Sequence, residues 1–113
     1  MDKDYQCYFE FTLDIIGGKW KPLILYHIDK HKVIRYGELR REITKINERM
    51  LTRQLRELEK WDMINRKVYQ QVPPKVEYSL TETGKSVMPI MINLRDWGKA
   101  YNEEHKVYDF HGE

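Results

Sequence analysis

The sequence contains little cysteine and no long hydrophobic segment. Its 113 residues include one cysteine, which can form neither an internal disulfide framework nor a cysteine-rich zinc site. The longest apolar runs, Pro22 to Tyr26 and Val87 to Ile92, are too short to cross a bilayer. No segment of the signal-peptide type opens the sequence. We therefore expect a cytoplasmic protein without a membrane partner.

Patterns typical of catalysis and metal binding are also absent. No Ser, His and Asp set and no paired carboxylates occur in a recognisable motif, so we do not expect an enzyme. Gly17-Gly18-Lys19 lacks the earlier glycine and the following Ser or Thr of a phosphate-binding loop, and we interpret it as a helix stop. His27 and His31 could face one metal ion, but no third ligand lies at a suggestive spacing. The sequence predicts no metal and no cofactor.

Charge is distributed unevenly along the chain. Hydrophobic residues make up 41% and charged residues 34%, which is typical of a globular fold, and the length suits a single domain over 1–113. The net charge is +2, but from Lys19 to Lys75 there are 15 Lys or Arg against 7 Asp or Glu. The middle of the chain therefore carries +8 and the flanks together −6. Such a basic centre is equally typical of a solvated surface and of a phosphate-binding face.

The first half of the sequence shows helical periodicity. It predicts helices over 9–16, 20–29, 36–43 and 47–60, with a loop over 30–35 and a turn over 44–46. Gly17 and Gly18 should stop the first helix, because glycine adopts the left-handed conformation that helix ends favour. The side chain of Asn47 should cap the fourth helix, with Glu48 placed well against the positive end of the helix dipole.

After Trp61 the periodicity changes to alternation. Residues 64–70 and 76–80 are predicted to be two strands, with Pro73 and Pro74 at the hairpin tip because proline cannot donate to a ladder. Thr81 and Glu82 should begin a long terminal helix that Pro89 kinks or splits. The order predicts a mainly α fold with a small β-hairpin, a winged helix-turn-helix with dimerisation helices at both termini.

The helix over 47–60 carries the strongest functional signal. On a helical wheel at about 100° per residue, its leucines share one face. The opposite face carries four cations at spacings of 4, 3 and 4 residues: Arg49, Arg53, Arg56 and Lys60. An ordinary solvated basic face is the plain alternative. However, a row of cations repels itself unless phosphates neutralise it, and Arg can donate two hydrogen bonds to guanine.

The predicted hairpin supplies a second basic segment. Arg66, Lys67 and Lys75 lie on or near a ribbon whose prolines stiffen its tip, as in a wing that reaches a neighbouring groove. A solvated hairpin is the alternative. Shorter hydrogen-bonding groups stand near the start of the fourth helix. The predicted DNA-binding residues are Asn47, Arg49, Thr52, Arg53, Arg56, Lys67 and Lys75.

The terminal helix is apolar on more than one face. Val87, Ile90, Met91, Leu94, Trp97 and Tyr101 share one face, and Met88 with Ile92 forms a second strip. One domain covers only one face, so the other should meet a symmetry mate, with help from the first helix. The predicted dimer interface contains Phe9, Met88, Ile92 and Trp97.

Cys7 stands just before the first predicted helix. Free N–H groups at a helix start favour the thiolate, which makes Cys7 a candidate redox switch. The alternative is an unreactive thiol packed among Tyr5, Tyr8 and Phe9.

Four segments in order give the sequence a family resemblance. Thr12-Leu-Asp-Ile-Ile-Gly-Gly-Lys-Trp-Lys-Pro-Leu-Ile-Leu25, Arg35-Tyr-Gly-Glu-Leu-Arg-Arg41, Met50-Leu-Thr-Arg-Gln-Leu-Arg-Glu-Leu58 and Val72-Pro-Pro-Lys-Val-Glu-Tyr-Ser-Leu-Thr81 resemble the HxlR family of bacterial regulators, relatives of the MarR group. The resemblance covers about residues 7–98. It implies a winged-helix dimer that binds palindromic operator DNA, with 47–60 as the recognition helix and 71–75 as the wing tip.

The same resemblance bears on regulation. A cysteine at the position of Cys7 is common in the family, and some members use it to sense oxidants or electrophiles. Tyr8 replaces the proline that often follows. The sequence thus predicts a sequence-specific transcriptional regulator, either repressor or activator, that binds double-stranded DNA as a homodimer and responds to an oxidant or a small effector. The alternatives are a winged-helix protein-interaction module and a non-specific nucleic-acid binder.

Overall fold

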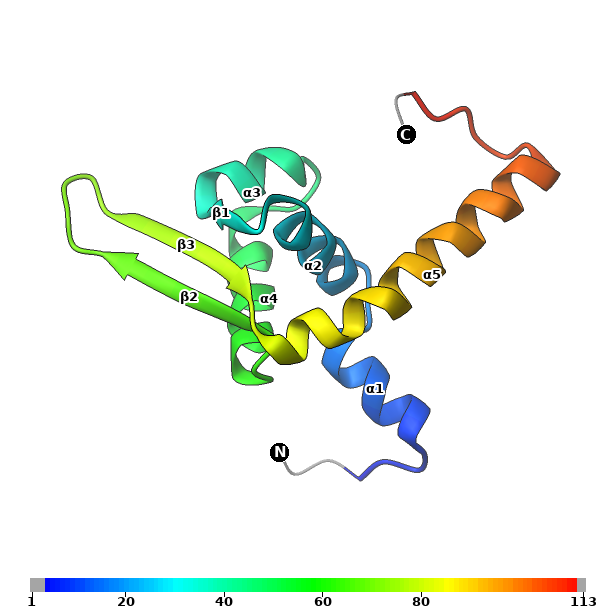
Figure 1. Ribbon diagram of the computed structural model, residues 1–113, viewed down its shortest axis with the longest axis horizontal. Helices are drawn as coiled ribbons and strands as arrows, with labels where there is room; N and C mark the ends of the chain where they lie inside the picture. The colour runs from blue at the N-terminus through cyan, green and yellow to red at the C-terminus, as the bar shows by residue number, and fades with distance from the viewer. Residues whose placement is uncertain (1–3, 112–113) are drawn as a thin grey trace.

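The computed structural model describes residues 4–111, which form five helices and a small sheet whose β2–β3 hairpin projects to one side (Figure 1). The single-domain prediction over 1–113 also included residues 1–3 and 112–113, which lie outside the described residues. The elements follow the order α1 (Tyr8–Ile16), α2 (Trp20–His31), β1 (Val33–Arg35), α3 (Tyr36–Glu42), α4 (Glu48–Lys60), β2 (Ile64–Tyr69), β3 (Lys75–Leu80) and α5 (Glu82–His105). This arrangement confirms the predicted winged helix-turn-helix.

The core lies where α2, α3 and α4 pack together against the sheet. Leu51, Leu55 and Leu58 of α4 are buried, which confirms the predicted leucine face. They meet Ile24 and Ile28 of α2 in one hydrophobic cluster. Each fully buried aliphatic side chain of this kind stabilises the fold by about 1.5–3 kcal/mol. The opposite face of α4 is therefore directed outward.

The predicted helix boundaries near α1 and α4 are also confirmed. The N–H of Gly17 donates to the Leu13 carbonyl at 2.7 Å, and Gly18 adopts a φ of +84°, the left-handed conformation expected at this stop. At the start of α4, Oδ1 of Asn47 accepts the Met50 N–H at 2.8 Å. This side-chain cap satisfies one of the free donors of the helix start.

The prediction of a loop over 30–35 is wrong. Helix α2 continues to His31, and residues 33–35 form the strand β1, which pairs antiparallel with β3 so that Arg35 lies opposite Glu77. The sheet order is β1-β3-β2. Ile34, buried between two exposed neighbours, anchors β1 in the core. Alternation over three residues is too short to identify a strand before its partner is known.

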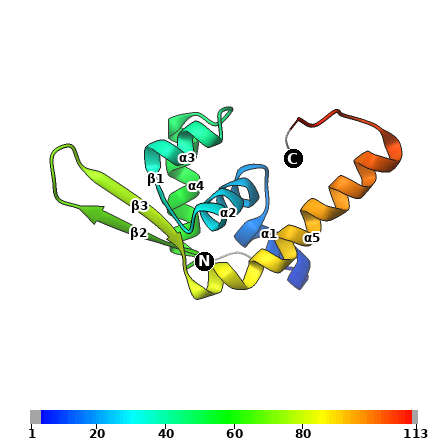
Figure 2. The ribbon, with the colours of Figure 1, turned by 45° about the horizontal axis from the view of Figure 1, so that its top comes forward.

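Helix α5 leads away from the body on the side opposite the hairpin (Figures 1 and 2). Pro89 lies inside this single 24-residue helix, so it does not split the helix. The ribbon instead changes direction between its first turns and its second half (Figures 1 and 2). None of the helices within residues 4–111 has the length and apolarity needed to cross a membrane.

The start of α5 is fastened to the turn between α4 and β2. The Thr81 hydroxyl donates to the Asp62 carbonyl at 2.6 Å and accepts the Gly84 N–H at 2.9 Å. A Cβ at Gly84 would lie 2.1 Å from the Met63 carbonyl oxygen, so only glycine permits this backbone contact. The hairpin, the turn and α5 are therefore packed tightly together at Thr81.

The burial of Met88 contradicts its predicted place in the dimer interface. Its side chain is 6% exposed and belongs to the hydrophobic core of its own chain, together with Met91. The sequence pattern placed Met88 on a second strip, because it did not show which face of α5 the body covers.

Candidate nucleic-acid interface

The helix-turn-helix consists of α3, residues 43–47 and α4. Ile43 and Ile46 are buried and hold the turn against the core. The Tyr36 hydroxyl lies 3.2 Å from Oγ1 of Thr52 and donates to the Glu48 carbonyl at 3.4 Å. These contacts fix the orientation of α4 relative to α3.

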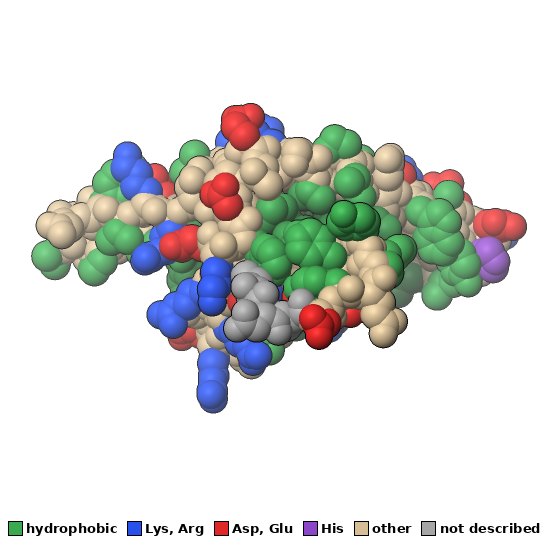
Figure 3. All heavy atoms as spheres, turned by 90° about the horizontal axis from the view of Figure 1, so that it is seen from below, with side chains coloured by type: hydrophobic (Ala, Val, Ile, Leu, Met, Phe, Trp, Pro, Cys, Tyr) green, Lys and Arg blue, Asp and Glu red, His purple; other side chains and the backbone are tan. Residues whose placement is uncertain are grey.

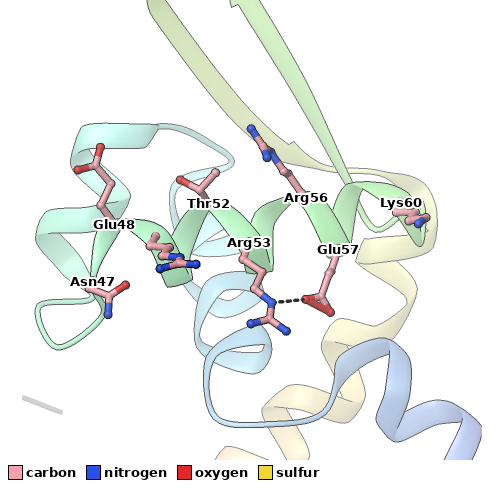
Figure 4. A pocket seen from close by; sticks show the side chains of 8 residues that line it. Asn47, Glu48, Thr52, Arg53, Arg56, Glu57 and Lys60 are labelled. Atoms are coloured by element: carbon pink, nitrogen blue, oxygen red, sulfur yellow. Dashed lines mark ion pairs between the residues drawn. The ribbon is translucent and has the colours of Figure 1, made fainter.

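The outward face of α4 gathers the predicted cationic row. The hollow seen in Figure 4 is open and lined by residues of α4 and its cap: Asn47, Glu48, Arg49, Thr52, Arg53, Arg56, Glu57 and Lys60. All four cations of the row are exposed. Within residues 4–111 no ion pair involves Arg49, Arg56 or Lys60. Three positive charges are thus available to an anionic partner.

Glu57 interrupts the row. Its Oε2 lies 3.8 Å from Nε of Arg53, a pair exposed enough to be worth under about 1 kcal/mol. Its Oε1 lies 3.1 Å from Nζ of Lys21, which is buried on α2. The carboxylate therefore holds α4 against α2 and partly neutralises the cationic face at one point.

Two of the predicted polar contacts already have structural tasks. Oδ1 of Asn47 caps α4 by accepting the Met50 N–H, while its amide nitrogen has two N–H groups that can be donated to another partner. Thr52 is half-buried beside Tyr36. Their contact with DNA stays a prediction, as it does for the arginines.

The hairpin brings Lys67 and Lys75 to the same ring. Their Nζ atoms lie 4.8 Å and 4.5 Å from the centroid of Tyr69. The Tyr69 hydroxyl donates to Glu77 at 2.9 Å, and Lys75 pairs with the other oxygen of that carboxylate at 3.3 Å. The Tyr69 hydrogen bond, with help from Lys75 and Arg35, lowers the pKa of Glu77 although burial opposes this.

The two lysines consequently differ in availability. The Lys67 side chain is exposed, whereas Lys75 opens β3 and keeps only 26% of its side-chain surface accessible. Arg66 is engaged with Glu59 of α4 at 3.1 Å. A hollow between α4 and the hairpin includes Arg56, Lys60 and Arg66, so the predicted helix and wing residues adjoin.

The histidines considered as metal ligands face a carboxylate. Nδ1 of His27 lies 2.7 Å from Oε1 of Glu42, and His31 pairs with the other carboxylate oxygen. Burial acts to raise the pKa of Glu42, but the hydrogen bonds to the two imidazoles outweigh it and lower the pKa. No cluster of three side chains suited to a metal ion occurs among the residues that the structure describes.

A surface of a different kind lies on the terminal helices. On α1, Tyr8, Phe9 and Leu13 are exposed, and Phe9 keeps 72% of its surface accessible. On α5 a strip along one side of the helix is exposed: Ile90, Leu94, Trp97 and Tyr101. Trp97 and Tyr101 stack with their centroids 5.3 Å apart. Figure 3 shows hydrophobic side chains gathered on this side of the molecule.

Of the predicted interface residues, Phe9 and Trp97 belong to this apolar surface. Ile92 is 36% exposed but lies more than about 130° around the helix from the strip. Its contact with a second copy stays a prediction.

Cys7 is the N-cap residue of α1. Its Sγ accepts the Glu10 N–H at 3.5 Å, and its side chain is exposed. The thiol is thus placed at the helix start, as predicted, and is not packed among the neighbouring aromatic rings.

Comparison with known proteins agrees with this architecture. The profile of the HxlR-like helix-turn-helix family matches residues 15–106. The chain is 55% identical over 97 residues to YdeP, an uncharacterised helix-turn-helix transcriptional regulator of Bacillus subtilis. The aligned residues cover 86% of this chain and 75% of YdeP.

Two solved structures of the redox regulator HypR are also similar. The reduced form superposes with a TM-score of 0.82 at 48% identity, over 90% of this chain and 100% of HypR. The oxidised form gives a TM-score of 0.78 at 52% identity, over 83% of this chain and 96% of HypR.

Proposed function

This chain belongs to the HxlR-like family of helix-turn-helix transcriptional regulators, and we propose that it binds a palindromic operator in double-stranded DNA as a homodimer. Helix α4 enters the major groove and the β2–β3 hairpin acts as the wing. The observation that carries this proposal is the exposed face of α4, on which Arg49 and Arg56 have no ion-pair partner within residues 4–111.

In this proposal the arginines of α4 recognise the DNA bases. An α-helix fits the major groove of B-DNA, and an arginine there can donate two parallel hydrogen bonds to the O6 and N7 atoms of guanine. Arg49, Arg53 and Arg56 are exposed on the side of α4 that is opposite its buried leucines. Lys67 and Lys75 on the wing supply charge for phosphates, which position the protein without reading sequence.

The second copy covers the apolar surface of α1 and α5. Ile90, Leu94 and Trp97 are each more than half exposed in the single chain, and with Tyr101 they form one continuous strip. Large contiguous apolar surfaces of this kind mark association sites. A twofold axis beside α5 would place the two α4 helices about 34 Å apart, one DNA turn, as a palindrome requires.

We further propose that oxidation at Cys7 controls binding. The thiol is exposed at the start of α1 and adjoins the same apolar surface through Tyr8 and Phe9. The similarity to HypR, a redox regulator, supports this role. A single cysteine limits the chemistry to alkylation, to a mixed disulfide with a small thiol or to a Cys7 bridge between subunits. The reducing cytoplasm, where DNA is accessible, suits such a sensor.

A competition experiment tests the proposal. DNA selected by the protein from a random-sequence pool is labelled and challenged with unselected duplex of the same length. We expect the selected DNA to bind at least about 1,000-fold more tightly, as in specific regulators. Equal affinities would indicate a non-specific binder, and absence of binding to any duplex would leave a protein-interaction module.

A further inference from the structure

A second basic groove lies between α3 and the start of β3, next to the hairpin tip. It is lined by Arg35 at the end of β1, Arg41 in the last turn of α3, and Pro74 with Lys75 where β3 begins. The consecutive elements β1 and α3 thus bring two cations, Arg35 and Arg41, to the place where β3, distant in sequence, contributes Lys75. None of the predicted DNA-binding residues except Lys75 belongs to this groove.

The acids near the groove are already engaged. Oε1 of Glu38 accepts the backbone N–H of Arg35 at 3.1 Å, which caps α3. Glu77 accepts from Tyr69 and pairs with Lys75. Arg35 and Arg41 are exposed, and within residues 4–111 neither guanidinium forms an ion pair. The groove therefore carries three positive charges, on Arg35, Arg41 and Lys75, against the two carboxylates of Glu38 and Glu77, and the guanidinium groups remain open to a further anion.

The Arg41 guanidinium lies beside Gly37 of the same helix. A Cβ built on Gly37 would lie 3.7 Å from Nη1 of Arg41, the one atom within 4 Å. The Arg41 side chain accordingly extends back along α3 by one turn, over the glycine and along the groove.

The groove continues the surface of α4. Tyr36 and Val76 line both this groove and the hollow between α4 and the hairpin. Thr52, Arg56 and Lys60 line both that hollow and the outward face of α4. A connected series of hollows, each with cations among its lining residues, therefore leads from α4 past Tyr36 to α3 and the wing.

From this placement we propose that Arg35 and Arg41, with Lys75, form a clamp for backbone phosphates of duplex DNA. The inference rests on the proposed function. With α4 in the major groove, the preceding helix α3 crosses the sugar–phosphate backbone that borders it. Guanidinium groups suit phosphate because they donate two parallel hydrogen bonds. The clamp positions α4 and reads no bases.

The test measures how DNA binding depends on salt. Anisotropy of a fluorescent 30-base-pair duplex of scrambled sequence gives the affinities of the wild type, Arg35→Ala and Arg41→Ala between about 50 and 200 mM salt. Each lost phosphate contact should reduce the slope of log affinity against log salt by about 0.9. Lys85→Ala, which removes an equal charge on α5 where Lys85 pairs with Glu82 at 3.2 Å, is the matched control and should keep the wild-type slope.

A second measurement separates a clamp from base recognition. Arg41→Ala should weaken binding to selected and scrambled duplexes by the same factor, so their affinity ratio is retained. Wild-type slopes in both arginine variants would overturn the clamp while leaving the proposed function intact. A fall in the affinity ratio would assign Arg41 to base reading and also overturn it. Failure of the wild type to bind either duplex would instead refute the proposed function. Melting temperatures confirm folding, since both arginines are exposed.

Discussion

The ammonium of Lys21, buried in α2, lies 3.1 Å from the carboxylate of Glu57 on the outward side of α4. The pair crosses from the interior to the surface, because the Lys21 side chain is 9% exposed and that of Glu57 is 41% exposed. Removing one partner is therefore not equivalent to removing the other.

Replacing Glu57 should destabilise the fold more than replacing Lys21. Glu57→Ala leaves a buried ammonium without its acceptor, which costs about 1–3 kcal/mol. Lys21→Met keeps the packing of the alkyl chain and leaves a half-exposed carboxylate beside Arg53, so we expect a loss under about 1 kcal/mol. Urea unfolding of the two variants measures the difference, and equal losses would contradict this asymmetry.

Each arginine of the α4 face should contribute to operator binding without supporting the fold. Arg49→Ala, Arg53→Ala and Arg56→Ala are each expected to weaken binding to selected DNA by about 1–3 kcal/mol. Thermal unfolding should change little, because Arg53 has only a weak exposed pair and the other two have none within residues 4–111. Full affinity in the triple variant would remove α4 as the recognition helix.

The dimer should depend on the apolar strip of α5. Trp97→Glu places a charge on a side chain that is 69% exposed in the single chain, so each copy should still fold. We expect sedimentation of this variant as a monomer at micromolar concentrations at which the wild type is a dimer. Lys99→Glu, which changes an exposed residue on the other side of α5, is the control. A dimeric Trp97→Glu would place the interface elsewhere.

Glu42 should make stability depend on pH. Because hydrogen bonds to His27 and His31 lower its pKa in the folded state, the carboxylate stabilises the protein above the ordinary value of 4.5, and this stabilisation is lost as the pH falls through the lowered value. Glu42→Gln should therefore unfold more easily at pH 7. The gap between variant and wild type should narrow in unfolding experiments below about pH 4.5, and a gap independent of pH would be inconsistent with this origin.

Oxidation should affect DNA binding only when Cys7 is present. Diamide is expected to abolish binding by the wild type, and a reductant should restore it, because the exposed thiol at the start of α1 forms a disulfide. Cys7→Ser replaces Sγ with a hydroxyl oxygen that can also accept the Glu10 N–H, so the helix start is preserved. Gel shifts of both proteins before and after treatment make the comparison. The same response in both would exclude Cys7 as the sensor.

Local signals explain why α4 was predicted almost to the residue. Its leucine spacing, its cap at Asn47 and its cationic row all lie within fourteen successive positions of the sequence, 47–60. The sequence does not predict the strand β1, because three residues are too few to show alternation and β1 is stabilised by pairing with β3, which is distant in sequence. Likewise, the pattern of α5 shows two apolar strips, and only packing against α2 and the sheet shows that one residue of each strip, Met88 and Met91, is buried.

The features missed at the candidate site arise from tertiary contacts. Lys21 and Glu57 are 36 positions apart, and nothing in either segment marks them as partners. The pairing of Glu42 with both histidines depends on how α3 lies across α2. The reduced exposure of Lys75 follows from Tyr69, which lies opposite it on β2, and from Glu77 on its own strand.

The tight connection at Thr81 makes the β2–β3 hairpin and α5 a single rigid unit. One residue separates β3 from α5, and the backbone contact of Gly84 with Met63 leaves no space in which the two could turn independently. The hairpin and α5 extend in opposite directions from Thr81. In the proposed dimer, a rotation of one α5 against the other must therefore also displace the attached wing, and the displacement is larger at the wing tip. A signal received at the subunit contact can thus alter the distance between the two wings while every side chain on the DNA-facing surface keeps its own neighbours.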